Sequence, residues 1–126
     1  MSFRFEIPCV SEEEVARVVE WVLFQRKYRA YTERTRGRHP ETDYLDVMGQ
    51  KALTTIYGKY EILLQFSIRK RKLTLCEVGA SYLVNPIEER EDPQLEMISL
   101  KTGGVYGMVE AELRIIMTEI LARLKG

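Results

Sequence analysis

The first element that the hydrophobic pattern predicts is a strand close to the N-terminus. Phe3, Phe5 and Ile7 alternate with charged residues until Pro8 interrupts the run. An alternation of period two places every second side chain on the buried face of a sheet. We therefore expect a strand over residues 3–8.

A helix is predicted to begin near residue 12. Ser11 and Glu14 have the spacing of a capping box, in which two side chains satisfy the free amides of a helix start. The acidic residues Glu12 and Glu13 also lie favourably at the positive end of the helix dipole. At helical spacing the inner face of this helix is formed by Val15, Val18, Val19 and Val22.

The end of this first helix is open to two interpretations. Four aromatic residues lie nearly opposite the valine face at 100° per residue: Trp21, Phe24, Tyr28 and Tyr31. Either the helix continues to about Thr35 and is covered on both sides, or it ends near Gln25 and residues 28–32 are extended. We favour the long helix. Its aromatic face would then pack against another subunit, which makes these four residues the candidate interface.

A second helix is predicted between Thr42 or Asp43, as the cap, and Gly58. Apolar and small residues keep helical spacing in this segment at Leu45, Met48, Gly49, Ala52, Leu53 and Ile56. Thr54, Thr55 and Tyr57 favour a strand instead. The helix remains the preferred interpretation.

The second half of the chain predicts a β-hairpin, a further strand and a helix. Residues 61–68 and 73–83 read as the two strands of the hairpin, with a turn in 69–72, and a loop follows from Asn85 to Pro93. Residues 95–100 predict another strand, which Gly103 and Gly104 end. The last helix shows an apolar stripe at Val105, Val109, Leu113, Ile116, Ile120 and Leu124.

Together these elements predict a small α+β fold, with residues 1–126 as a single domain. The predicted order is β-α-α-β-β-β-α. An antiparallel sheet of about four strands, with two to three helices packed on one face, satisfies this order.

Composition places the chain among ordinary globular proteins. The chain has 126 residues, of which 45% are hydrophobic and 30% charged, which suits one domain and is too charged for a membrane span. The N-terminal residues lack the pattern of a secretory leader. We expect a cytoplasmic protein with no membrane partner, in which Cys9 and Cys76 are reduced and buried.

Positive charge is concentrated although the formal net charge is zero. Two stretches, 26–38 and 69–72, contain the candidate anion-binding and nucleic-acid-binding residues Arg26, Arg29, Arg34, Arg36, Arg38, Arg69, Lys70, Arg71 and Lys72. Tyr28, Tyr31 and Tyr44 could stack on unpaired bases beside them. The alternative is a solvated hairpin turn and an exposed helix end, which the zero net charge favours.

No residue pattern in the chain predicts a catalytic centre, a metal site or a cofactor. His39 is the single histidine, and the glycines at 103, 104 and 107 match no phosphate-binding loop. Asp43 and Asp46 would lie on one face of the predicted second helix, at a spacing that fits no calcium loop.

The function that these observations favour is a non-catalytic interaction or assembly domain. It would be homo-oligomeric or a small subunit of a larger complex, so that its partner is itself or another protein. The alternative is a nucleic-acid-binding accessory protein that uses stretches 26–38 and 69–72. An enzyme whose site the sequence does not reveal is the third hypothesis.

Overall fold

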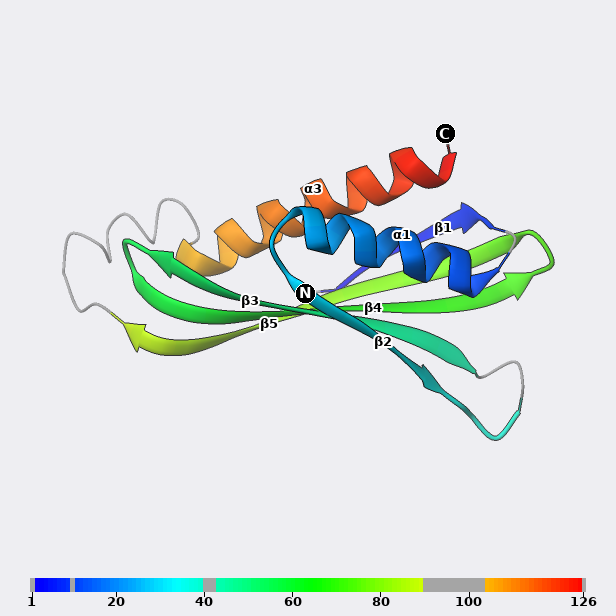
Figure 1. Cartoon of the computed structure of the whole chain (residues 1–126), viewed down its shortest axis with the longest axis horizontal. Coiled ribbons are helices and arrows are strands. Elements are labelled where there is room, and N and C mark those ends of the chain that lie inside the picture. The colour runs from blue at the N-terminus through cyan, green and yellow to red at the C-terminus, as the bar shows by residue number, and fades with distance from the viewer. Residues whose placement is uncertain (1, 10, 40–42, 90–103, 126) are drawn as a thin grey trace.

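The computed structural model describes residues 2–9, 11–39, 43–89 and 104–125, which form one antiparallel sheet and two helices (Figure 1). The strands are β1 (Ser2–Pro8), β2 (Arg29–Thr35), β3 (Tyr44–Thr55), β4 (Gly58–Lys72) and β5 (Leu75–Glu89), and the helices are α1 (Glu12–Gln25) and α3 (Gly104–Lys125). In space the strands follow the order β1-β5-β4-β3-β2, and every neighbouring pair is antiparallel. The α+β class and the antiparallel sheet are as expected.

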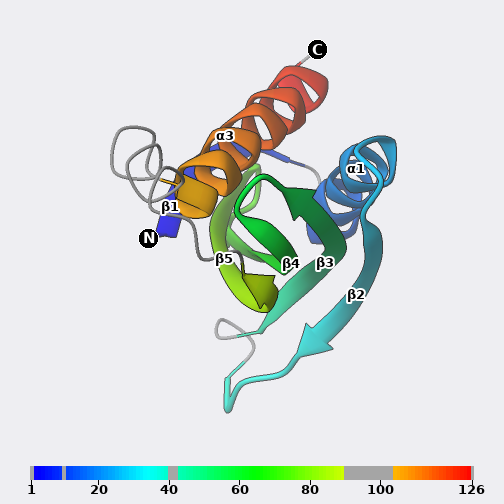
Figure 2. The same cartoon turned by 90° about the vertical axis from the view of Figure 1, so that its left-hand side faces the viewer.

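Both helices lie on the same face of the sheet, which we call the inner face (Figures 1 and 2). Alternate residues of β4 show the division clearly, because Ile62, Leu64, Phe66 and Ile68 are buried against the helices. Val109, Leu113, Ile116 and Ile120 of α3 are equally buried, and they join the residues of β4 in one hydrophobic cluster. The opposite, outer face of the sheet is covered by no element of the described ranges (Figure 2).

The predicted N-terminal strand and the start of the first helix are confirmed. β1 ends at Pro8, and the side chain of Ser11 accepts a hydrogen bond of 3.2 Å from the backbone N–H of Glu14. Val15, Val19 and Val22 are fully buried. The amphipathic C-terminal helix is confirmed as well, since α3 covers the predicted stripe.

The long first helix is wrong, and the alternative end near Gln25 is the observed one. Lys27 adopts a left-handed backbone conformation with φ of 71°, which stops the helix. The backbone N–H of Tyr28 then donates to the carbonyl of Leu23 at 3.0 Å, and that of Lys27 to Phe24 at 3.1 Å. These two bonds define a Schellman motif with lysine in the place usually taken by glycine. The chain leaves it as strand β2.

The predicted second helix is also wrong, because residues 44–55 form β3. Its inner face carries Leu45, Val47 and Gly49, at the period of a strand. The helical spacing in the sequence arises because Met48 and Ala52, on the outer face, are apolar or small as well. A Cβ added to Gly49 would lie 3.1 Å from Leu23 Cδ1 and 3.4 Å from Tyr28 Cδ2, so the glycine lets the end of α1 approach the strand closely.

The hairpin is confirmed, but its strands are longer than predicted. Residues 69–72 belong to β4, since Arg69 pairs with Glu77 and Lys72 with Leu75, and the connection is at Leu73 and Thr74. Asn85 and Pro86, expected in a loop, belong to β5. The sheet therefore has five strands, and the observed order within the described residues is β-α-β-β-β-β-α. The strand predicted at 95–100 lies outside the described residues.

A disulfide joins the end of β1 to the start of β5. Cys9 and Cys76, which the sequence predicted to be reduced, are bonded to each other across a sequence separation of 67 residues. Both are buried, as expected. The pairing follows from the sheet, because β1 and β5 are antiparallel neighbours with Ile7 opposite Cys76. Sequence alone could not place two residues so far apart side by side.

Neither helix in the described part of the chain is long and apolar enough to cross a membrane.

The disulfide is expected to stabilise the fold substantially. Replacing both cysteines by serine should lower the free energy of unfolding by about 2–4 kcal/mol, because the crosslink restricts a long loop in the unfolded chain. Urea unfolding with and without reductant measures this effect. Reductant should lower the midpoint of the wild type and leave that of the double variant unchanged. An equal response of both proteins would contradict the prediction.

Candidate functional site

The outer face of the sheet divides into an apolar half and a basic half, which meet at Gln65 and Ser81. Strand alternation turns Gln65 of β4 toward this face, and Gln65 lies opposite Met48 of β3 and Ser81 of β5. Two shallow hollows share Gln65 and Ser81 in their lining. We call these two hollows together the outer-face site.

The apolar hollow has a volume of about 140 Å³ and is lined by Met48, Leu63 and Leu83. Leu63 and Leu83 are direct neighbours across β4 and β5, and Tyr31 of β2 lies beyond Met48 in the adjoining row. Tyr31 is 55% exposed and Leu83 56% exposed. The hollow is therefore an apolar surface that no described side chain covers.

The basic hollow is larger, at about 250 Å³, and three arginines line it. Arg4 comes from β1, and Arg69 and Arg71 come from the end of β4. Gly79 belongs to the same lining, and a Cβ built on it would meet no atom closer than 3.9 Å. The absent side chain of Gly79 thus leaves open space between Arg4 and the two arginines of β4.

One carboxylate balances part of this positive charge. Arg71 donates two hydrogen bonds of 3.2 Å to Glu77, and this contact is the main reason why the pKa of Glu77 is lowered. The charges of Arg4 and Arg69 lower the same pKa further. Arg69 also stacks on Tyr44, with its guanidinium carbon 4.8 Å from the ring centroid. Arg4 and Arg69 are therefore the arginines of this hollow whose charge Glu77 does not pair directly.

A second carboxylate, Asp46, lies beside the two hollows and organises their polar groups. It is only 8% exposed, and it accepts hydrogen bonds from Ser67 Oγ at 2.7 Å and from Gln65 Nε2 at 3.2 Å. The hydroxyl of Ser67 and the side-chain amide of Gln65 are therefore already bonded to Asp46 within the protein. The prediction that Asp43 and Asp46 lie on one face of a helix is wrong, because Asp43 precedes β3 and Asp46 lies within it.

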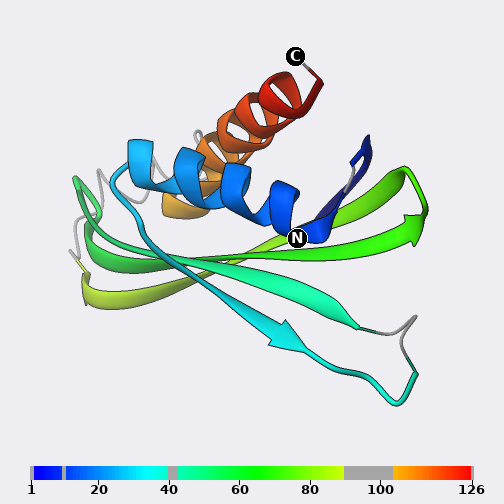
Figure 3. The same cartoon turned by 45° about the vertical axis from the view of Figure 1, so that its right-hand side comes forward.

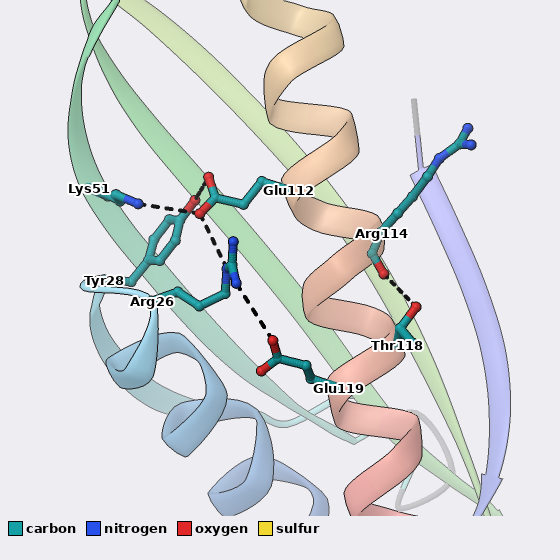
Figure 4. A network of polar contacts seen from close by, with 7 residues as sticks. All are labelled: Arg26, Tyr28, Lys51, Glu112, Arg114, Thr118 and Glu119. Atoms are coloured by element: carbon teal, nitrogen blue, oxygen red, sulfur yellow. Dashed lines mark hydrogen bonds and ion pairs between the residues drawn. The ribbon is translucent and has the colours of Figure 1, made fainter.

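Two predicted site residues, Arg26 and Tyr28, belong instead to a polar network on the helix side of the sheet (Figure 4). Glu112 of α3 is its centre, accepting from the Tyr28 hydroxyl at 2.9 Å and from Lys51 Nζ at 3.3 Å. Arg26 Nε lies 3.4 Å from Glu112 as an ion pair without hydrogen-bond geometry, and the same side chain reaches Glu119 at 3.6 Å.

The contacts of this network connect elements of the fold to one another, so we assign it a structural role. Burial, followed by the charge and hydrogen bond of Glu112, raises the pKa of Tyr28 well above its ordinary value, so the hydroxyl stays protonated and continues to donate. Since Tyr28 follows α1, Lys51 is in β3 and Glu112 is in α3, one carboxylate ties three elements together. Tyr82 and Glu110 form a second such link at 2.6 Å, where burial and the bond raise the pKa of Tyr82 to about 12.

The four aromatic residues predicted as one helix face do not share a surface. Tyr28 is only 3% exposed and belongs to the core. Trp21 is covered in part by Arg123 of α3, whose guanidinium carbon lies 3.5 Å from the ring centroid. Phe24 remains exposed on α1, whereas Tyr31 lies on the outer face of β2. The predicted interface is therefore divided among different surfaces.

The basic stretches are likewise divided. Arg34, at the end of β2, lies 2.6 Å from Glu13 of α1, which ties the strand to the helix. Arg36 and Arg38 are exposed after β2, and Lys70 and Lys72 are exposed at the end of β4. Because β2 and β4 run in the same direction, all four lie toward the same end of the sheet. Arg29 lies at the opposite end of β2.

Sequence reasoning missed the outer-face site apart from Arg69 and Arg71, and it singled out Tyr31, which lies beside the apolar hollow. A signal for it exists in β4, where Gln65, Ser67 and Arg69 alternate with buried apolar residues. That alternation predicts a sheet with one polar face. It does not show which strands lie beside β4, and so it could not bring Arg4 or Leu83 to the same place.

Comparison of the chain with protein-family models, with curated proteins and with solved structures finds no match.

The Glu112 network allows a direct test of its structural role. Glu112→Gln leaves Arg26 and Lys51 without their shared carboxylate and should lower the free energy of unfolding by about 1–2 kcal/mol, less than for a fully buried pair because the side chains are partly exposed. Glu119→Gln, which removes only the outer contact of Arg26, is the matched control and should cost about 0–0.5 kcal/mol. Equal effects in urea unfolding would show that Glu112 is not the centre of the network.

Proposed function

We propose that the chain is a non-catalytic interaction and assembly domain that forms a homo-oligomer and uses the apolar half of its outer-face site. The observation that carries this proposal is the apolar surface around Met48, Leu63 and Leu83, which no described side chain covers, on a sheet whose two described helices lie on the other face. Exposed apolar side chains that adjoin one another are typical of a contact surface for protein. A polar rim from Gln65 and Ser81 completes the pattern of an interface.

The arrangement favours protein over a small molecule as the partner. The apolar hollow holds only about 140 Å³ and its two leucines are direct neighbours on adjacent strands, whereas sites for small ligands are larger and enclose most of the ligand. The adjoining basic hollow adds specificity, because a partner surface with an apolar side chain next to a carboxylate would fill both hollows.

Substitution of Leu83 tests this proposal. Leu83→Glu introduces a charge into the apolar hollow and should reduce the solution mass measured by light scattering, because a buried, unpaired carboxylate opposes association. Leu73→Glu is the control, since Leu73 is 87% exposed in the β4–β5 connection, away from the outer-face site. An unchanged mass for Leu83→Glu would remove the outer-face site from the proposal.

Nucleic acid is the second candidate partner, and a specific observation supports it. Arg4, Arg69 and Arg71 surround one hollow, and the rings of Tyr31 and Tyr44 lie on the same sheet face. Arginines that neutralise phosphates beside exposed aromatic rings are typical of a surface for single-stranded nucleic acid. This surface includes Arg69 and Arg71 of the predicted basic stretch 69–72, and no residue of stretch 26–38 lines the basic hollow.

The salt dependence of binding tests the nucleic-acid hypothesis. If arginines of the basic hollow contact phosphates, Arg4→Gln and Arg69→Gln together should weaken binding of a short single-stranded oligonucleotide and reduce the slope of log K against log salt by about 1–2. Arg36→Gln, in the loop after β2, serves as the control. Binding that is absent, or a slope that both variants leave unchanged, would reject this function for the basic hollow.

The cytoplasmic location predicted from the sequence remains part of the proposal. The Cys9–Cys76 disulfide is the feature that opposes it, because such bonds persist mainly in oxidising compartments. Thiol labelling of freshly lysed cells that produce the protein decides between the two. Labelled, free thiols at Cys9 and Cys76 would support a cytoplasmic location. Thiols that are protected from labelling by the disulfide would support an oxidising compartment.

A further inference from the structure

Among the described strands, β2 forms one edge of the sheet, and no described strand pairs with its outer backbone edge. It is hydrogen-bonded to β3 on one side, and the strand order places no described strand on the other. Figure 3 shows β2 as the outermost strand, with its end directed away from the helices. Five of its seven residues are exposed. An edge of this kind is a template for another strand.

Two of the three charged residues of β2, Arg29 and Glu33, lack partners within the described part of the chain, whereas Arg34 pairs with Glu13 of α1. Arg29 and Glu33 are both exposed, and neither has an ion pair or side-chain hydrogen bond there. Glu33 also lies directly opposite Asp46 of β3, on the same outer face. Two like charges in direct cross-strand positions destabilise a sheet. A positive charge placed on the free side of Glu33 would offset this repulsion.

A second copy of the chain supplies that charge by symmetry. When two copies of β2 pair antiparallel about a twofold axis at Tyr31, Arg29 of each copy lies opposite Glu33 of the other. Arg29, Tyr31 and Glu33 all face the outer side, since they pair with Gln50, Met48 and Asp46. The pairing therefore brings both charge pairs to one face with the two tyrosine rings between them. Centring the axis on Thr32 would place Arg29 opposite Thr35 instead and lose both charge pairs.

From this self-complementarity we propose that β2 is a dimerisation edge, along which two copies join their sheets with Tyr31 opposite Tyr31 and Arg29 opposite Glu33. The inference rests on the proposed function in naming a second copy as the partner, but it uses a different surface from the hollow at Leu83. The pairing unites two five-stranded sheets into one continuous sheet and removes an exposed edge from each copy.

Reversing the charge of Arg29 or Glu33 distinguishes pairing along β2 from association through any other surface. Arg29→Glu and Glu33→Arg each turn both intermolecular pairs into like charges, and each variant alone should dissociate about tenfold or more readily than the wild type, halving the solution mass at intermediate concentration. An equimolar mixture of the two variants restores both pairs, because one chain then carries two glutamates and the other two arginines. Native mass spectrometry should show heterodimers in that mixture. The double variant R29E/E33R should dimerise by itself.

The controls distinguish failure of the inference from failure of the proposed function. Arg36→Glu reverses a charge just beyond β2 and should leave the mass unchanged, and circular dichroism shows that each variant is folded. An oligomeric wild type whose mass Arg29→Glu does not alter, or single variants whose mixture does not recover dimers, overturns the β2 edge and leaves the outer-face proposal standing. A wild type that is monomeric at all concentrations overturns both.

Discussion

The left-handed turn at Lys27, just after the end of α1, is the constraint on which the rest of the structure depends. The left-handed residue and the two backbone bonds of its Schellman motif turn the chain back after Gln25, so the next seven-residue segment joins the sheet as β2. The same turn places Tyr28 beside Leu23 over Gly49. A helix that continued to Thr35 would have replaced β2, and the described sheet would then end at β3.

Two polar arrangements with different roles follow from this turn. On the helix side, Glu112 gathers Tyr28, Lys51 and Arg26 and holds α3 against the end of α1. On the outer side, no described element covers the polar and apolar residues that four strands place in the two hollows. Charged groups that are enclosed and paired stabilise the fold, whereas Arg4 and Arg29 are exposed to solvent and Arg69, which stacks on Tyr44, lines the basic hollow.

Antiparallel sheets with helices on one face leave two kinds of surface unsatisfied, and this chain shows both. The open face carries the apolar and basic hollows, and the edge strand β2 carries backbone groups and two charges, on Arg29 and Glu33, that no described residue pairs. Exposed apolar patches and open strand edges are both surfaces that another protein chain can complete, and we therefore infer assembly as the function.

The sequence by itself determined the elements whose signals are local. The capping box at Ser11, the alternation of Phe3, Phe5 and Ile7, and the stripe of α3 each depend on neighbours a few residues away, and all three are observed. Tertiary structure decided the remainder. A lysine took the left-handed position at which a glycine is the usual signal, and β3 carried small or apolar residues on both faces, so local patterns favoured a helix in each place. The Cys9–Cys76 bond, the outer-face site and the free edge all depend on which strands are neighbours, and strand order is set by packing across the whole sheet rather than by any local pattern.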